Sequence, residues 1–214
     1  MTNTKGRSPA GIGLTPDDVV RAALDVLDEQ GLDAVSTRAI ADRLDVRMNT
    51  VLWHVKTKSR LLELMAEAIL GEVSLTNLDG TGKEQARELM LRLRQTLLSH
   101  RDGALVVSGT FSAEPRTLRF ANSLVTVLLD ESGSRKVAAW SMWALFYFTL
   151  GLVQEEQAAP LSIHDRLLDK VSPTEYPALA AVLDDYESAA FDDRFRFGID
   201  GILSSLDHTR RQTQ

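Results

Sequence analysis

The sequence predicts an all-α protein in which a small three-helix unit precedes a larger helical unit. Two observations lead to this prediction. Apolar residues recur at helical spacing along most of the 214 residues, and no useful length of strand-type alternation interrupts them. Capping residues, prolines and glycines stand where these periodic segments begin and end.

The first predicted helix begins after Thr15 and ends before Gly31. Thr15 can cap free backbone amides, Pro16 suits the first turn, and two acidic residues follow where the helix dipole favours negative charge. Gly31 then stops the helix. Its inward face is expected to consist of Val19, Ala22, Ala23, Val26 and Leu27.

Two short helices come next, separated by a tight turn at Leu44–Val46. Ser36 caps the first of them, and the second runs from about Met48 to Val55. This is the arrangement of a helix-turn-helix, whose second helix fits the major groove of DNA. We therefore expect residues 14–60 to form an N-terminal domain of this type.

A linking helix over residues 58–78 leads to a second, larger domain at residues 83–207. The loop at 77–82, rich in Asn, Asp and Gly, marks the boundary. In the second domain, helices are expected at 83–100, 104–109, 114–130, 135–157 and 184–206, and prolines punctuate its one long connection.

Composition excludes several classes of protein. The chain has no cysteine, which excludes disulfides, thiolate metal ligands and a thiol nucleophile and favours a reducing compartment. Residues 1–13 hold no apolar run, so we expect no signal peptide and a cytoplasmic protein.

The uncharged segment 137–153 is shorter than the roughly 20 residues that a spanning helix needs, and it contains Ser141, Thr149 and Gly151. It therefore predicts a buried helix and no membrane contact.

The net charge of −6 conceals a basic segment at residues 36–60, which holds six basic and two acidic residues. Phosphate binding requires such local positive charge, although the spacing fits a basic solvated surface equally well. On DNA, the start of the first short helix would hold a phosphate, the start of the second would meet base edges, and lysines beyond it would contact the backbone. These positions are Thr37 and Arg38, then Arg47, Met48, Asn49 and Thr50, then Lys56 and Lys58.

Several motifs resemble the TetR family of transcriptional regulators. Those near the N-terminus are Ser36-Thr37-Arg38, Trp53-His54-Val55-Lys56, Lys58 and Leu61-Leu62. Two others resemble the tetracycline-repressor branch, namely His100-Arg101-Asp102-Gly103-Ala104 and Phe148-Thr149-Leu150-Gly151. The resemblance extends from about Thr15 to Leu206. It implies an all-α homodimer whose first three helices bind a palindromic DNA operator and whose larger domain binds a small-molecule effector and pairs the subunits.

The resemblance adds Leu52 and His54 to the DNA contacts. Leu52 lacks the hydroxyl of the family's usual aromatic residue, so one phosphate contact is expected to be missing. Met48 and Asn49 replace the glutamine and proline of tetracycline repressors, which predicts a different operator sequence. Trp53 belongs to the predicted DNA-binding set, although we expect most of its area to pack under the second helix of the motif.

The resemblance also implies a ligand pocket among the helices after residue 83. Where tetracycline repressors bind magnesium through a histidine, this chain has Val107, which cannot coordinate a metal. We therefore expect no tetracycline–magnesium effector, metal or cofactor, but a small apolar or aromatic effector with Thr110 and Ser123 as polar anchors. The apolar positions would look the same in a filled core. The further positions implied are Ser74, Leu89, Leu93, Phe111, Met142, Trp143, Phe146 and Glu155.

Two helices are expected to form a dimer interface. The helix at 137–153 is apolar on too many faces for one small domain to cover, and pairing it with the last helix of each subunit would make a four-helix interface. The alternative is an unusually hydrophobic monomer core. The apolar stripe on the last helix comprises Phe191, Phe195, Ile199, Ile202, Leu203 and Leu206.

Three functions remain open from the residues alone. The first is a dimeric repressor that a bound effector releases from DNA. The second is a helix-turn-helix regulator without an effector, whose C-terminal helices serve only for assembly. The third is a helical enzyme acting on hydrophobic compounds, but the sequence offers no nucleophile with a matching base, so we expect no catalytic activity.

Overall fold

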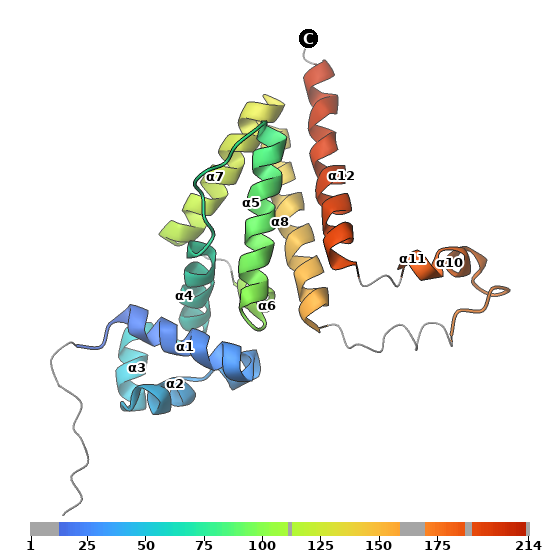
Figure 1. The fold of residues 1–214 in the computed structure, drawn as a ribbon. Coiled ribbons are helices and arrows are strands. Elements are labelled where there is room, and N and C mark those ends of the chain that lie inside the picture. Colours follow the sequence, from blue (N-terminus) through green and yellow to red (C-terminus); the bar gives the residue numbers. More distant parts are fainter. Residues whose placement is uncertain (1–12, 111–112, 159–169, 187–189, 213–214) are drawn as a thin grey trace, which may run out of the picture.

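The computed structural model describes residues 13–110, 113–158, 170–186 and 190–212, and all regular structure in these residues is helical. The elements are α1 (Pro16–Gln30), the short 3₁₀ helix η1 (Leu32–Ala34), α2 (Thr37–Leu44), α3 (Met48–Val55), α4 (Lys58–Gly71), α5 (Gly82–Ser99), α6 (Gly103–Ser108), α7 (Pro115–Ser132), α8 (Arg135–Ala158), α10 (Pro177–Ala181), α11 (Leu183–Tyr186) and α12 (Phe191–Gln212). Helices α1–α3 form a small unit at one end, α4 leads away from it, and α5, α7, α8 and α12 stand together as a larger bundle (Figure 1). The all-α prediction is confirmed.

Local sequence explains where the first helices begin and end. Thr15 Oγ1 accepts a hydrogen bond from the Asp18 amide, and the Thr15 amide donates to the Asp18 carboxylate in return. Gly31, at φ = +86°, ends α1 in a conformation that favours glycine. Ser36 caps α2 by accepting from the Ala39 amide. The predicted limits of α1 and α3 are confirmed.

Helix α4 is shorter than the predicted linking helix, because it ends at Gly71 rather than at residue 78. The chain that follows is held by Arg92 on α5. Its guanidinium donates hydrogen bonds to the backbone carbonyls of Ser74, Thr76 and Asn77 at 3.0, 2.6 and 3.2 Å. These carbonyls find their partner on another helix, which satisfies them without continuing α4. Helical periodicity does not reveal such a long-range partner.

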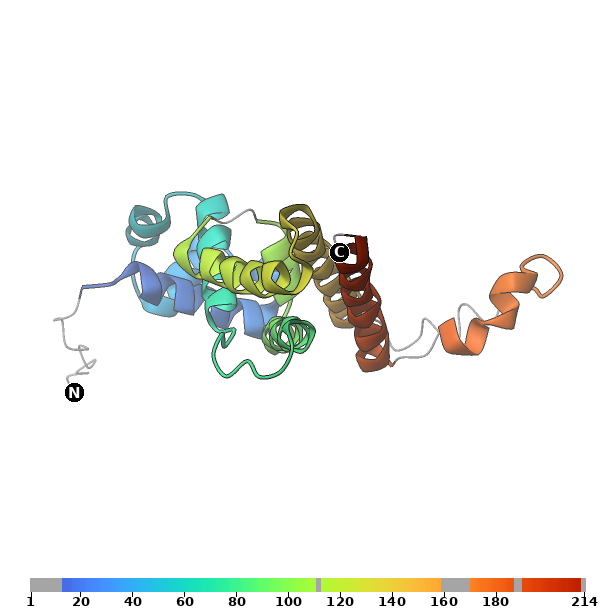
Figure 2. The ribbon, with the colours of Figure 1, turned by 90° about the horizontal axis from the view of Figure 1, so that it is seen from above.

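The last predicted helix, at 184–206, is also corrected by the structure. A single-turn helix, α11, comes first, and the long helix α12 begins only at Phe191 and continues to Gln212. Two acidic residues in the first turn of α12 favour a helix start at this point. Helices α10 and α11 lie apart from the bundle in both views of the molecule (Figures 1 and 2).

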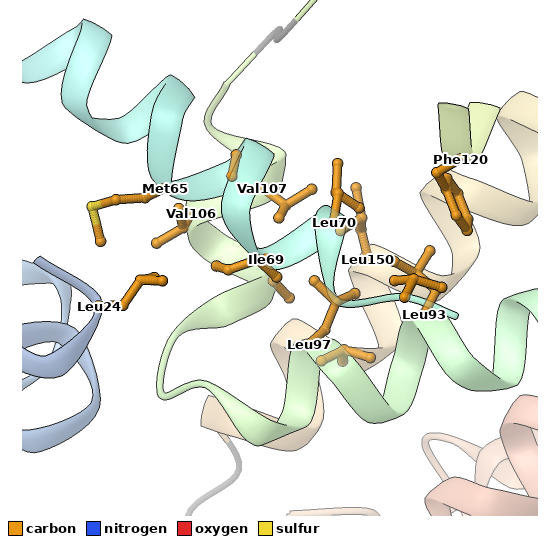
Figure 3. Packing of buried hydrophobic residues seen from close by; sticks show 14 of the residues in the cluster. Leu24, Met65, Ile69, Leu70, Leu93, Leu97, Val106, Val107, Phe120 and Leu150 are labelled. Atoms are coloured by element: carbon orange, nitrogen blue, oxygen red, sulfur yellow. The ribbon is translucent and has the colours of Figure 1, made fainter. Parts of the chain in front are cut away.

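One apolar core connects the small unit to the larger bundle. Leu24 on α1 and the α4 residues Met65, Ile69 and Leu70 are all buried in it. Figure 3 shows the α4 side chains spread along this core, from the side of Leu24 to the side of Leu150 on α8. Helix α4 therefore belongs to both parts of the molecule.

Helix α8 packs against α5, α6, α7 and α12. By length and composition it is the one helix in the described residues that could cross a membrane, but its neighbours are those of a core helix. Helices α8 and α12 are closely packed. A Cβ atom added at Gly198 on α12 would lie 2.1 Å from the Phe148 ring on α8. Glycine at this position thus lets the two helices pack together.

Candidate DNA-binding surface and ligand cavity

Four basic side chains of the helix-turn-helix are exposed. Arg38 lies in the first turn of α2, Arg47 precedes α3, and Lys56 and Lys58 stand at the turn between α3 and α4. None of the four makes an ion pair or a side-chain hydrogen bond with a residue that the structure describes. We call these four residues the basic surface. It carries the unneutralised positive charge that phosphate binding requires.

Two further basic residues of the segment bind acidic partners instead. Arg43 contacts Asp25 at 3.1 Å and Glu29 at 2.7 Å, both on α1, and its hydrogen bond lowers the pKa of Glu29 below the usual value. Arg60 on α4 binds Glu114 just before α7, which raises the pKa of Arg60. The count of six basic residues in the sequence therefore overstates the charge available to DNA.

Helix α3 presents Trp53 outward. The buried positions of this helix are Val51 and Val55, and Trp53 lies two residues from each, about 200° around the helix axis. Its side chain is 77% exposed, and its ring meets His54 edge-on with centroids 4.7 Å apart. The prediction that most of Trp53 packs under the helix is wrong for this geometrical reason.

The other predicted DNA contacts lie on α2 and α3 with different exposure. Met48 and Asn49, at the start of α3, are exposed. The half-buried positions are Thr37, Thr50, Leu52 and His54. Residues available to DNA therefore gather at the start of α3 and around Trp53.

A cavity of about 700 Å³ lies between α4, α6, α7 and α8. Five of the predicted ligand-binding residues line it, namely Val107, Thr110, Met142, Trp143 and Phe146. Other lining residues are not among those expected from the sequence, including Ala66 and Leu70 on α4, Thr117 on α7, and Tyr147, Leu150 and Gln154 on α8. The α8 residues recur at helical spacing after Trp143, so helical periodicity could have predicted them. Periodicity could not predict the α4 residues, because their place in the lining depends on how distant helices pack.

Three predicted ligand contacts do not line the cavity. Leu89 and Leu93 are fully buried on α5 and fill the core instead, as Figure 3 shows for Leu93. Ser123 on α7 is half-buried outside the lining. Phe111 lies outside the described residues. Two further positions, Ser74 and Glu155, are exposed and also lie outside the lining.

The cavity wall is bonded to α4 through one carboxylate. Glu67 accepts hydrogen bonds from the backbone amides of Arg116 and Thr117 at 2.6 and 2.8 Å, and from the Thr117 hydroxyl at 2.9 Å. It thereby caps the N-terminus of α7. Since Thr117 lines the cavity, a displacement of this wall acts directly on α4.

A second set of contacts joins the turn between α5 and α6 to the small unit. His100 Nδ1 lies 3.1 Å from the Asp28 carboxylate on α1, and its Nε2 lies 3.1 Å from Glu72 at the end of α4. Asp102 accepts a hydrogen bond from the Leu32 amide at 2.8 Å. The turn that starts α6 is thus fastened to α1, η1 and α4 together.

Exposed aromatic residues on α8 and α12 form a further surface. Trp140 and Tyr147 are mostly exposed on α8, and Phe197 on α12 is 85% exposed. Most of the apolar stripe on α12, which was expected to face a partner subunit, is instead buried against this chain's own helices. Phe195, Ile199, Leu203 and Leu206 are buried within the same chain, where α12 packs on α8. A partner subunit would therefore meet the edge of the stripe rather than its centre.

The chain is similar to regulatory proteins along nearly all of its length. Residues 19–65 match the family described as bacterial regulatory proteins, tetR family, and residues 76–210 match the tetracyclin repressor-like C-terminal domain. Tetracycline repressor protein class A from transposon 1721 of Escherichia coli is 33% identical over 197 residues, which cover 90% of this chain and 90% of that protein.

Solved structures share the fold. Apo ActR from Streptomyces coelicolor has a TM-score of 0.87 at 26% identity, covering 96% of this chain and 100% of that chain. ActR in complex with actinorhodin has a TM-score of 0.82 at 27% identity, and the match covers 91% of this chain and 95% of that chain. BioQ with its double-stranded DNA operator has a TM-score of 0.68 at 26% identity, and the match covers 90% of this chain and 98% of that chain. Since both family descriptions match and the Escherichia coli relative spans 90% of the sequence, the chain belongs to the TetR family of bacterial regulatory proteins.

Proposed function

We propose that the chain is a repressor that binds a palindromic operator as a homodimer and leaves it when a small apolar or aromatic effector occupies the cavity. The observation that carries DNA binding is the basic surface, whose cations have no partner among the described residues. BioQ, which shares the fold, was solved with its DNA operator, and ActR was solved with actinorhodin. The relatives are transcriptional regulators rather than enzymes.

In this proposal α3 enters the major groove. The N-terminal end of a recognition helix is the part that reads base edges, while surrounding cations and hydroxyl groups hold phosphates. Trp53, one turn after Asn49 on α3, adds an exposed aromatic surface. We assign base-edge contacts to Arg47, Met48, Asn49, Thr50 and Trp53, and backbone contacts to Thr37, Arg38, His54, Lys56 and Lys58.

We assign DNA binding to residues 14–60, and effector binding and dimerisation to residues 83–207. A dimer places two recognition helices at half-sites about 34 to 36 Å apart. The exposed Trp140, Tyr147 and Phe197 support pairing through α8 and α12, because apolar patches of this kind mark protein interfaces. A DNA-binding chain without cysteine is expected in the cytoplasm.

Release by an effector follows from the two roles of α4. Its residues Ala66 and Leu70 line the cavity, and its first residue, Lys58, belongs to the basic surface. A compound that prefers one position of α4 shifts the population towards that position by its differential affinity. Because the two half-sites have a fixed separation, the shifted dimer binds the operator less tightly.

DNA binding is tested with the full chain and duplexes selected from a randomised pool, by fluorescence anisotropy over a range of salt concentrations. Arg38→Ala and Lys58→Ala are each expected to weaken binding and to reduce the slope of log K against log salt by about 1. Arg196→Ala, which removes an exposed cation on α12, is the matched control. Binding indifferent to salt, or lost equally in the control, would contradict the proposal. Binding that no compound relieves would favour a regulator without an effector.

A further inference from the structure

We infer that the cavity selects an uncharged, planar aromatic compound that carries a hydroxyl donor, and that Gln154 recognises its oxygen. This inference rests on the proposed effector role of the cavity and specifies the chemistry of the ligand. Three properties of the lining lead to it, namely its charge, the shape of its aromatic side chains, and the state of its hydrogen-bonding groups.

None of the described residues that line the cavity has a charged side chain that could pair with an ionised ligand. Glu67 touches the lining through Thr117, but its carboxylate is already bonded to two amides and a hydroxyl of α7. An ionised compound would lose its hydration here without gaining a counter-charge, which is unfavourable. A neutral compound avoids this penalty.

Flat aromatic faces line the cavity on the side of α8. Trp143 and Tyr147, one turn apart, stack with ring centroids 5.1 Å apart and planes inclined by 24°. Phe146 lies between them in sequence and also lines the cavity. Such rings pack best against another aromatic plane. The volume of about 700 Å³ lies within the range of about 300 to 1,000 Å³ for drug-sized ligands, so it accommodates several fused rings.

Three aliphatic hydroxyl groups of the lining already donate hydrogen bonds inside the protein. Those of Ser108 and Thr110 donate to backbone carbonyls at 3.2 Å, and that of Thr117 donates to Glu67. A hydroxyl in this state offers a ligand only its acceptor lone pairs. A ligand donor is complementary to these three groups. The Tyr147 hydroxyl and the Trp143 indole N–H make no hydrogen bond with the described residues and can donate to a ligand oxygen.

Gln154 differs from these hydroxyl groups. It lines the cavity near the end of α8, and its side chain makes no hydrogen bond with any residue in the described part of the chain. A side-chain amide can accept through its oxygen and donate through its nitrogen. It can therefore accept a hydrogen bond from a ligand hydroxyl or donate one to the same oxygen, which makes Gln154 a specificity-determining residue.

Three probes, applied to the full chain without DNA, separate these requirements. 2-Hydroxyanthracene is planar, neutral at pH 7 and carries a donor. Anthracene-2-sulfonate keeps the rings and adds a permanent charge, and cyclododecanol keeps the hydroxyl without the plane. Calorimetric titration and thermal unfolding measure binding. We expect 2-hydroxyanthracene to raise Tm and to bind at least about tenfold more tightly than either other probe.

Variants test the role of Gln154. Gln154→Leu removes the amide at similar size and is expected to weaken 2-hydroxyanthracene about fivefold to tenfold. Gln95→Leu, the same change at an exposed position of α5, is the control and should leave the affinity unchanged. Equal affinity for the sulfonate or for cyclododecanol, or an unaffected Gln154→Leu variant, would overturn the inference. So would a failure of 2-hydroxyanthracene to bind, whereas salt-dependent DNA binding would still support the proposed regulator.

Discussion

The hydroxyl of Thr117 on α7 donates a hydrogen bond of 2.9 Å to Glu67 on α4, where two backbone amides of α7 converge on the same carboxylate. One side chain therefore holds the cavity wall against the helix that begins at the basic surface. A ligand that displaces Thr117 therefore acts on α4 directly, through this hydrogen bond. The contact is thus both a helix cap and a connection between the two functional regions.

Glu67→Ala is expected to lower the free energy of unfolding by about 2 kcal/mol, because a charged acceptor is lost at a helix N-terminus. Glu67→Gln should lower the free energy of unfolding by less, since its neutral amide oxygen still accepts hydrogen bonds from α7. Urea unfolding measures both changes. Glu155→Ala, which breaks an exposed pair with Arg194, serves as the control and should cost less than about 1 kcal/mol. Similar losses in Glu67→Ala and the control would argue against the cap.

Arg94 is expected to stabilise the junction of α5, α8 and α12. Its side chain is only 6% exposed, binds Glu156 at 2.9 Å and Asp192 at 2.6 Å, and lies over the Phe195 ring. Arg94→Met should lower the free energy of unfolding by about 3 kcal/mol, because Glu156 keeps a half-buried charge without its partner. The double variant Arg94→Met with Glu156→Leu should recover part of the loss in thermal unfolding. No recovery would show that the stranded charge is not the cause.

Gly198→Ala should destabilise the chain, because the added Cβ would lie 2.1 Å from the Phe148 ring. We expect a loss of about 2 kcal/mol from overpacking, measured by urea unfolding. Gly201→Ala is the matched control on the same helix. Its Cβ meets nothing within 4 Å, so the change should stabilise α12 by about 0.5 to 1 kcal/mol. A Gly198→Ala variant as stable as the unchanged protein, or more stable, would contradict the close packing of α8 and α12.

The exposed position of Trp53 is testable by fluorescence. A variant with Trp140→Phe and Trp143→Phe leaves Trp53 as the only tryptophan. Because this side chain is 77% exposed, we expect emission at the long wavelength of a solvated indole, which then changes when duplex DNA is added. A variant that retains only Trp140 should not respond to DNA. Short-wavelength emission from Trp53 in the free protein would contradict its outward orientation.

Some of the functional regions were predictable because their signals are local. The start and end of α1 follow from Thr15 and Gly31, and the helix-turn-helix follows from a cap and a turn within a few residues. Val107 and Phe146 were placed in the ligand set by resemblance, and both line the cavity. Leu89 shares their apolar character but is buried in the core. Apolar character predicts burial, not which neighbour a side chain meets.

The helical class, the limits of the first helices and the helix-turn-helix follow from the sequence, because capping and periodicity act between residues three or four positions apart. Which cations face solvent and which helices enclose a cavity depends on how the helices pack. Arg43 meets carboxylates on another helix, and α4 supplies a wall to a cavity formed with α7 and α8. These outcomes depend on contacts between residues far apart along the chain, whose relative positions no local pattern contains.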